Sequence, residues 1–119
     1  MNETEHADER IAIWLIEDHD KLRATLEEII DLSMDCEVTA FSSCETALSK
    51  LGSEASPEVI ILDLGLPGMS GLEGIRQFKA LAPASEIVVF TVFDDRANVF
   101  QAICAGASGY LLKSEPLER

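Results

Sequence analysis

The sequence predicts one α/β domain in which helices cover both faces of a parallel, doubly wound sheet. Five short apolar runs alternate along the chain with segments of helical spacing. Most of these runs are continuously apolar, which is typical of parallel strands that are buried on both faces. The length of 119 residues suits one domain with one sheet-centred core.

The five strands and the four helices between them can be placed from the apolar pattern. The strands are expected at residues 11–16, 37–41, 59–62, 87–91 and 109–112. The helices are expected to carry Leu22, Leu26, Ile29 and Ile30; then Ala47, Leu48 and Leu51; then Leu72, Ile75, Phe78 and Leu81; and last Val99, Phe100, Ile103 and Cys104. Ser43 can cap the second helix, and Asp94 or Asp95 starts the fourth.

The two ends of the chain differ from this regular pattern. Residues 1–10 are acidic and polar, and we predict a disordered leader there, with the domain over residues 11–119. Ser114 and Pro116 signal the start of a fifth helix that the remaining residues are too few to complete. We therefore expect a piece of a longer protein, or a second chain that covers the exposed apolar side of the sheet.

The composition excludes several classes of function. With 22 acidic and 9 basic residues, the net charge of −13 argues against direct contact with nucleic acid or anionic membranes and favours cations or basic partners. The mean hydropathy of +0.13 excludes disorder over most of the length. No apolar run is long enough to span a bilayer. Three cysteines without a CxxC pair predict buried free thiols in a reducing cytoplasm.

Polar residues follow the strands at the positions where ligands bind in open α/β sheets. Glu17 and Asp18 follow the first strand, Asp63 the third, Thr91 ends the fourth and Lys113 follows the fifth. All carboxyl ends of a parallel sheet share one edge, so these side chains can converge. Close carboxylates repel by about 4 kcal/mol per pair at moderate effective dielectric, which predicts a bound cation such as Mg²⁺. An ammonium, a hydroxyl and a carboxylate nucleophile complete a site for phosphoryl transfer.

Four ordered motifs resemble the receiver domain of two-component response regulators. They are Glu17-Asp18, the loop from Asp63 to Gly71, Thr91, and the segment from Gly106 to Lys113. The resemblance implies a flavodoxin-like fold with strand order 2-1-3-4-5, and a phosphoryl group that Asp63 accepts from a sensor histidine kinase. The ending Gly-Tyr-Leu-Leu-Lys-Ser resembles the branch that is joined to LuxR-type DNA-binding output domains, of which these residues contain none.

The resemblance also implies individual roles. Asp18, Asp63 and the backbone carbonyl of Gly65 would bind Mg²⁺, and Glu17 would hold metal-bound water or reach the metal. Thr91 and Lys113 would bond the phosphoryl group. Tyr110 would turn inward as Thr91 moves, and this would switch the surface of the fourth helix, fifth strand and fifth helix toward an output domain or a homodimer. An ordinary half-buried tyrosine is the alternative for Tyr110.

A few positions depart from the family pattern or leave a choice open. Glu17 stands where aspartate is frequent, and Val92 where a smaller residue is usual. Phe93 and Gly65 occupy variable positions that tune phosphate lifetime in the family, and we expect Phe93 to screen the phosphoryl group from water. His19 is expected to be a surface residue at a helix start, because Mg²⁺ prefers oxygen ligands.

Three other functions are compatible with parts of this pattern. A Mg²⁺-dependent aspartyl-phosphate phosphatase generally has a second aspartate where Gly65 stands. A flavin-binding domain needs a phosphate loop after the first strand, where this chain has the acidic residues 17–20. A receiver that only docks, without phosphorylation, is the third. We predict a signalling module that assists its own phosphorylation and dephosphorylation, and not an enzyme that turns over a separate substrate.

Overall fold

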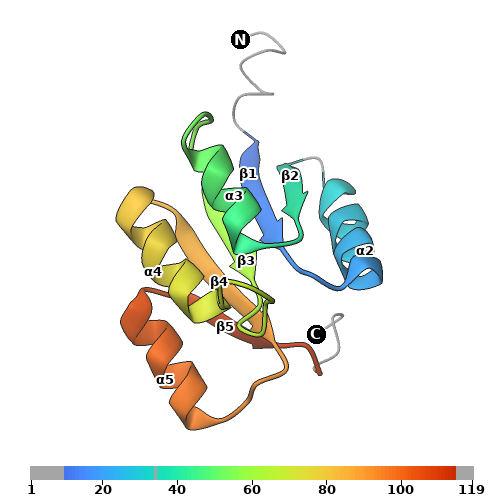
Figure 1. Ribbon diagram of the computed structural model, residues 1–119. Coiled ribbons are helices and arrows are strands. Elements are labelled where there is room, and N and C mark those ends of the chain that lie inside the picture. The colour runs from blue at the N-terminus through green and yellow to red at the C-terminus, as the bar shows by residue number, and fades with distance from the viewer. Residues whose placement is uncertain (1–9, 34, 115–119) are drawn as a thin grey trace, which may run out of the picture.

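The computed structural model describes residues 10–33 and 35–114, and it contains one five-stranded parallel sheet in the order β2-β1-β3-β4-β5 (Figure 1). The strands are β1 (Ile11–Ile16), β2 (Cys36–Phe41), β3 (Val59–Leu62), β4 (Glu86–Thr91) and β5 (Gly109–Leu112). The helices are α2 (Asp20–Asp31), α3 (Cys44–Leu51), α4 (Gly71–Leu81) and α5 (Arg96–Ala105). The predicted fold class and strand order are confirmed.

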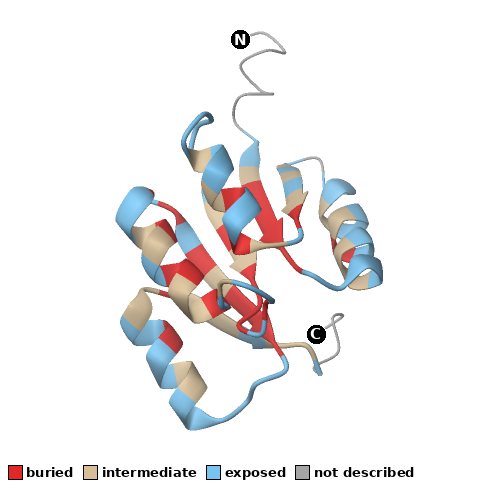
Figure 2. Ribbon diagram, in the orientation of Figure 1, coloured by how far each residue is buried: buried red, intermediate tan, exposed pale blue. Residues whose placement is uncertain are grey.

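The sheet lies between two helical layers of unequal size. α2 covers one face, and α3, α4 and α5 cover the other (Figure 1). The larger core cluster belongs to the three-helix side, where Ile75 and Phe78 of α4 are fully buried against Ile60 and Leu62 of β3. Burial is concentrated in the central strands, so the carboxyl ends of β1, β3 and β4 are fixed by the best-packed part of the molecule (Figure 2).

Side-chain caps set the start of each helix. The Ser43 and Asp95 side chains accept hydrogen bonds from backbone amides in the first turns of α3 and α5, so these predicted caps are confirmed. Ser70 caps α4 in the same way. His19 caps α2, since its Nδ1 accepts from the Leu22 amide at 3.2 Å. The exposed His19 is therefore a helix-start residue, as predicted, and Asp20 is the first residue of α2.

Some residues that the helical spacing assigned to the core are exposed. These residues are Ile29, Leu81, Phe100 and Ile103. In α5 the apolar residues surround the helix, so their spacing does not select one inner face, and only the small Ala102 is fully buried. The prediction of three buried thiols is confirmed for Cys44 alone, because Cys36 is half-buried and Cys104 is exposed. Burial and the nearby Glu45 carboxylate raise the pKa of the Cys44 thiol to about 12.

The face covered by α2 retains an apolar groove of about 170 Å³. Its lining is Leu15, Leu26, Ile30, Ile61, Val88, Phe90 and Leu111. Leu111 of β5 is exposed there. Within residues 10–33 and 35–114, no helix other than α2 packs on this face (Figure 1). The fifth helix predicted from Ser114 and Pro116 and the disordered leader both fall mainly outside the described residues.

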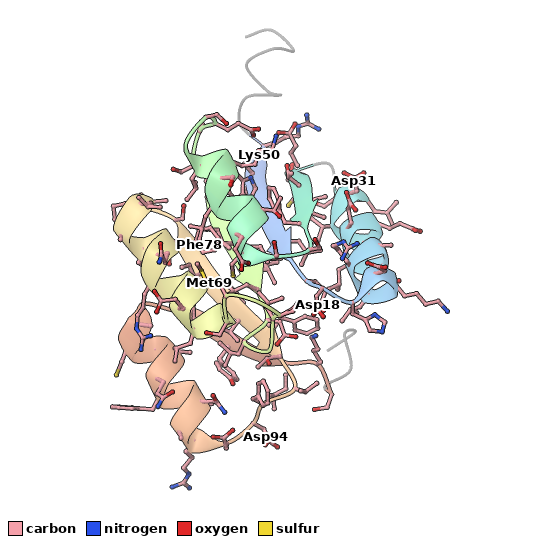
Figure 3. The ribbon with its side chains drawn as sticks, viewed as in Figure 1. Asp18, Asp31, Lys50, Met69, Phe78 and Asp94 are labelled. Atoms are coloured by element: carbon pink, nitrogen blue, oxygen red, sulfur yellow. The ribbon has the colours of Figure 1, made fainter. Side chains whose placement is uncertain are left out.

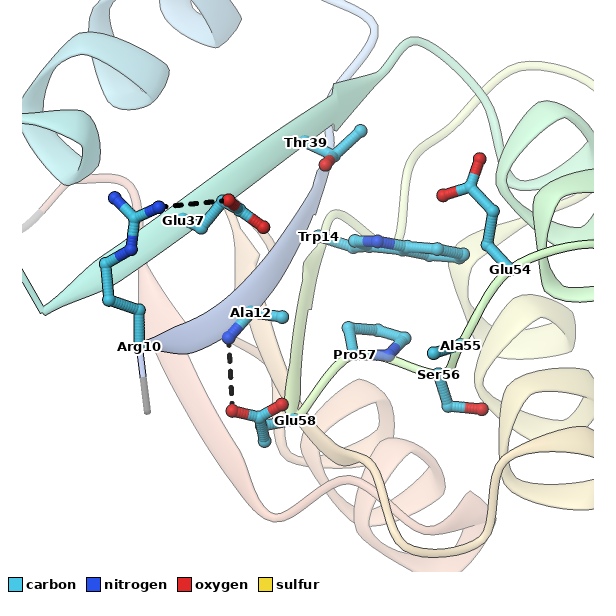
Figure 4. Close-up of a pocket in the computed structure, with 10 residues that line it drawn as sticks. All are labelled: Arg10, Ala12, Trp14, Glu37, Thr39, Glu54, Ala55, Ser56, Pro57 and Glu58. Atoms are coloured by element: carbon cyan, nitrogen blue, oxygen red, sulfur yellow. Dashed lines mark hydrogen bonds and ion pairs between the residues drawn. The ribbon is translucent and has the colours of Figure 1, made fainter. Parts of the chain in front are cut away.

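Another cavity, of about 430 Å³, lies near the start of β1 and is lined by residues of β1, β2 and the segment that precedes β3 (Figure 4). Its carboxylates are already engaged: Glu37 pairs with Arg10, Glu58 accepts from the Ala12 amide, and Glu54 pairs with Lys50. Across residues 10–33 and 35–114, every helix is too short or too polar to cross a membrane.

Candidate functional site

The carboxyl ends of β1, β3 and β5 bring together the acidic residues and the lysine that the sequence singled out. Lys113 Nζ lies 2.7 Å from Asp63 Oδ2 and 2.8 Å from Glu17 Oε1. Glu17 is 2% exposed and Asp63 is 7% exposed, so both carboxylates lie in the protein interior with one ammonium between them. Burying these charges is costly without such pairing, and Lys113 supplies it.

Three carboxylates lie close enough to share one cation. Glu17, Asp18 and Asp63 each offer an oxygen, and these oxygens all lie within 4.8 Å of one another. Asp18 is exposed at the edge of the cluster, beyond the end of β1 (Figure 3). An open set of carboxylate oxygens fits Mg²⁺, which keeps several waters and takes few protein ligands. Glu17, Asp18 and Asp63 would therefore hold the ion, and the Gly65 carbonyl stays a predicted ligand.

The Asp63 carboxyl is held in its ionised form. Burial alone would raise the pKa of Asp63. The hydrogen bond from Lys113, together with the Gly65 amide that donates to Oδ1 at 3.1 Å, outweighs this effect and lowers the pKa. The nearby Thr91 hydroxyl also contributes to the lowered pKa. Lys113 shows the reciprocal effect: burial lowers its pKa, and Asp63 and Glu17 raise it above the ordinary value. Asp63 is thus an ionised carboxylate at neutral pH.

Thr91 ends β4 with an unused hydroxyl. The residue is fully buried, and its Oγ1 has no hydrogen-bond partner among the described residues. Although this oxygen is close enough to Asp63 to affect its pKa, it does not reach hydrogen-bonding geometry with any described group. A buried hydroxyl without a partner is costly, so it is poised to donate to a group that enters beside Asp63.

Tyr110 is joined to the site indirectly, through the loop that follows Thr91. Its hydroxyl donates to the Phe93 carbonyl at 2.6 Å. Burial and the negative charges of Asp95, Asp63 and Asp94 raise the pKa of Tyr110. Tyr110 is thus linked to the Thr91 loop, and its predicted role in switching remains a prediction.

The Phe93 ring lies over Gly65, at the mouth of the site. A Cβ atom on Gly65 would be 3.1 Å from Phe93 Cε2 and 4.0 Å from Asp63 Oδ1. Phe93 is 40% exposed, so its ring stands between solvent and the loop beside the carboxylate. The two positions singled out in the sequence are in contact.

Two residues that shape the site, Arg23 and Glu45, were missed in the sequence, and Gly71 was named there only as the end of the loop motif. Arg23 Nη1 donates to the Glu17 carbonyl at 2.8 Å and so fixes the turn after β1. Gly71 donates its amide to the Leu64 carbonyl at 3.0 Å, which brings the start of α4 against β3. Glu45 of α3 accepts from the Met69 amide at 2.8 Å, across 24 residues of sequence. Only Gly71 gave a signal, as a glycine at the start of a helix.

Comparisons with known proteins agree with this geometry. The family model for the response regulator receiver domain matches residues 13–119. The nitrate/nitrite response regulator protein NarL of Escherichia coli (strain K12) is 36% identical over 105 residues, which are 88% of this chain and 49% of that protein. The chain spans about half the length of the curated relatives it matches.

Solved structures give the same assignment. A two-component response regulator of the LuxR family from Aurantimonas sp. SI85-9A1 has a TM-score of 0.81 and 32% identity, covering 89% of this chain and 76% of that one. A response regulator from Burkholderia pseudomallei, solved with a phosphorylated aspartic acid, calcium ion and citrate, has a TM-score of 0.81 and 30% identity, covering 91% and 62%. The chain therefore belongs to the response regulator receiver domain family, and its relatives are of the NarL and LuxR type.

Proposed function

We propose that Asp63 of this receiver domain accepts a phosphoryl group from a phosphohistidine of a sensor histidine kinase, and that Mg²⁺ assists the transfer. The observation that carries the proposal is the set of groups around Asp63: an ionised carboxylate bonded to Lys113 at 2.7 Å, beside a buried hydroxyl without a partner. The phosphorylated aspartate in the Burkholderia pseudomallei relative supports it.

In the proposed step, an Asp63 oxygen attacks phosphorus while the bond from phosphorus to the imidazole nitrogen breaks. The electron pair of that bond stays on the imidazole nitrogen, and the phosphoryl group becomes an acyl phosphate on Asp63. Lys113 stays beside the developing charge, and Thr91 donates its free hydroxyl to a phosphoryl oxygen. Mg²⁺, held by Glu17, Asp18 and Asp63, would offset negative charge on the transferred group.

A Mg²⁺-dependent phosphatase is the weaker alternative. Gly65 lies two residues after Asp63 and has no side chain to act as the acid and base that hydrolysis of a separate substrate needs. The chain therefore acts on its own aspartate and does not turn over a substrate.

The output of the switch passes through α5 and β5. A phosphoryl group brings about two negative charges to the end of β3, which draws Thr91 inward and moves the loop that leads into α5. Residues 71–114 contain four of the 22 acidic residues and four basic residues, so the region of α4 to β5 is close to neutral in a chain of charge −13. A second copy or an output domain can approach this region with little charge repulsion.

The whole regulator would work in the cytoplasm, where its kinase partner presents the phosphohistidine. Contact with DNA would belong to an output domain like those of the NarL relatives, and not to residues 1–119. The net charge of −13 supports that separation, since like charges repel the phosphate backbone.

Intact mass measured after incubation with acetyl phosphate tests the proposal. The wild-type protein is expected to gain one phosphoryl group when Mg²⁺ is present and none when it is chelated. Asp63→Asn should gain none under either condition, because an amide is not a nucleophile for phosphorus here. Sedimentation of the same samples reports whether the phosphorylated form dimerises. A folded wild-type protein without any mass gain would contradict the proposal and favour a receiver that only docks.

Replacing Phe93 with alanine is expected to shorten the half-life of the phosphorylated protein several-fold. The ring covers Gly65 beside Asp63, so its removal opens a path for the water that attacks the acyl phosphate. The half-life is measured by the decay of the phosphorylated mass after the donor is removed. Phe100→Ala is the matched control, because Phe100 is another exposed phenylalanine and lies on α5. Equal half-lives for wild type and Phe93→Ala would show that the ring does not screen the site.

A further inference from the structure

Glu45 is an exposed glutamate in the first turn of α3 whose carboxylate reaches into the loop that follows Asp63. Its Oε2 accepts a hydrogen bond of 2.8 Å from the Met69 amide. The hydrogen bond from the Met69 amide is the largest cause of a lowered pKa at Glu45, so the carboxylate stays ionised at neutral pH. The two residues belong to different helix–loop units, so the bond ties α3 to the loop between β3 and α4.

The loop is shaped to admit this carboxylate. A Cβ atom on Gly68 would be 2.5 Å from Glu45 Oε2, so a side chain at this position would displace the carboxylate from its present place. Gly68 also has φ of 71°, a backbone conformation that favours glycine. The missing side chain of Gly68 and its positive φ are two independent reasons for glycine in the turn that presents the Met69 amide to Glu45.

The same loop contains the backbone that lies beside the phosphate site. Gly65 donates its amide to Asp63 Oδ1, and Gly71 donates its amide to the Leu64 carbonyl. These bonds hold the two ends of the loop, and the bond from Met69 to Glu45 holds its middle. Without Glu45, the segment from Leu66 to Ser70 would lose its one side-chain bond to α3 among the described residues.

We infer that Glu45 is a positioning residue that fixes the loop after Asp63 and so sets the affinity of the acidic site for Mg²⁺. The inference rests on the proposed function. Glu45 does not touch the ion or the phosphoryl group; it holds the backbone around Gly65 in one arrangement. Loss of the bond leaves several loop arrangements populated, and the apparent affinity falls by the fraction that is competent to bind.

Two substitutions at Glu45 and one matched control test this role. Glu45→Ala removes the acceptor, whereas Glu45→Gln keeps a side-chain oxygen in place and should rescue the bond. Glu73→Ala is the control: Glu73 is a half-buried first-turn glutamate of α4, and it pairs with Arg76 and Gln77. Glu73→Ala changes the net charge by the same amount as Glu45→Ala, and it removes no side-chain bond to the loop.

Mg²⁺ affinity is measured by titration calorimetry, and hydrogen exchange of the Met69 amide is measured without Mg²⁺. Glu45→Ala is expected to weaken Mg²⁺ binding by about 3- to 10-fold, the worth of one hydrogen bond, and to speed Met69 exchange. Phosphorylation by acetyl phosphate should need more Mg²⁺ for half its maximal rate, with an unchanged rate at saturation. Glu45→Gln and Glu73→Ala should stay close to wild type.

The outcomes separate this inference from the proposed function. If the wild-type protein binds Mg²⁺ and gains a phosphoryl group, but Glu45→Ala matches Glu73→Ala in Mg²⁺ affinity and in Met69 exchange, the role of Glu45 is overturned alone. A wild-type protein that binds no Mg²⁺ overturns both. A fall in the saturated rate with unchanged Mg²⁺ affinity would mean that Glu45 acts on the chemistry or the fold, and it would also overturn the inference.

Discussion

Replacing Lys113 with methionine is expected to lower the free energy of unfolding by about 2–3 kcal/mol at pH 7 without Mg²⁺, because breaking a buried ion pair leaves uncompensated charge. The lysine is the one cation within 4 Å of the Asp63 and Glu17 carboxylates in the described structure. Its removal also takes away the proposed partner of the phosphoryl group, so we expect that phosphorylation would no longer switch the protein. Denaturant unfolding with and without Mg²⁺ measures the stability change.

Two further measurements test whether the stability loss of Lys113→Met comes from the missing charge. Mg²⁺ should stabilise Lys113→Met more than the wild type, because the ion replaces the missing positive charge. Lys50→Met is the matched control, since Lys50 pairs with Glu54 on the surface and should change stability little. If Mg²⁺ stabilises Lys113→Met no more than the wild type, the loss comes from packing and not from charge.

The contribution of Asp63 to stability should depend on pH with opposite sign in the wild type and in Lys113→Met. In the wild type the pKa of Asp63 lies below its unfolded value of 3.8, so its contribution to stability is present above that value and is lost as the pH falls through the folded pKa. Without Lys113, burial and the Glu17 charge raise the folded pKa instead. The stability difference between wild type and variant should therefore shrink as the pH falls from 7 towards 4.

Replacing Gly71 with alanine is expected to destabilise the protein by about 3 kcal/mol and to slow phosphoryl uptake, because the added methyl has no space. Its Cβ would be 2.0 Å from the Asp63 carbonyl oxygen and 2.6 Å from Leu64 Cα, both of them backbone atoms. To relieve the clash, the start of α4 must move away from the end of β3. Thermal unfolding and intact mass with acetyl phosphate measure the two effects.

Gly52→Ala is the control for the general effect of adding a methyl group to a glycine. Its Cβ would be 3.5 Å from the Ser49 carbonyl oxygen, an ordinary contact, at a φ of −71°. We expect unchanged stability or a gain of about 0.5 kcal/mol. If Gly71→Ala and Gly52→Ala had the same stability, the close approach of α4 to β3 would not be a real constraint.

The convergence of Glu17, Asp18, Asp63 and Lys113 could be predicted because it follows from topology alone. Parallel strands share the edge at which they end, so a polar residue after each strand is brought to one place whatever the details of packing. The same argument placed Thr91 at this edge. Topology could not predict that the Thr91 hydroxyl lacks a hydrogen-bond partner among the described residues, because this depends on atomic positions to within tenths of an ångström.

Other features could not be predicted from spacing or residue type. Phe100 and Ile103 have the spacing of core residues, but α5 is apolar on several sides and its periodicity selects no inner face. The bond from Met69 to Glu45 is made by a backbone amide, which every residue but proline possesses, so no residue type marks it. Residue type could not predict that His19 caps α2, because the neighbouring Asp20 is a more usual capping residue.

α5 buries little of its surface, and this affects the free energy that a signalling movement of the helix would require. Most of α5 is exposed or half-buried (Figure 2). Among its residues only Ala102 is fully buried, and Phe100 is 68% exposed. Little apolar area is lost from the core when α5 shifts, so its local opening costs a small part of the global unfolding free energy. The hydrogen bond proposed for Thr91 would then be comparable to the free energy of displacing the helix. On this proposal, α5 should shift transiently before any phosphoryl group is bound, and phosphorylation would select among these conformations.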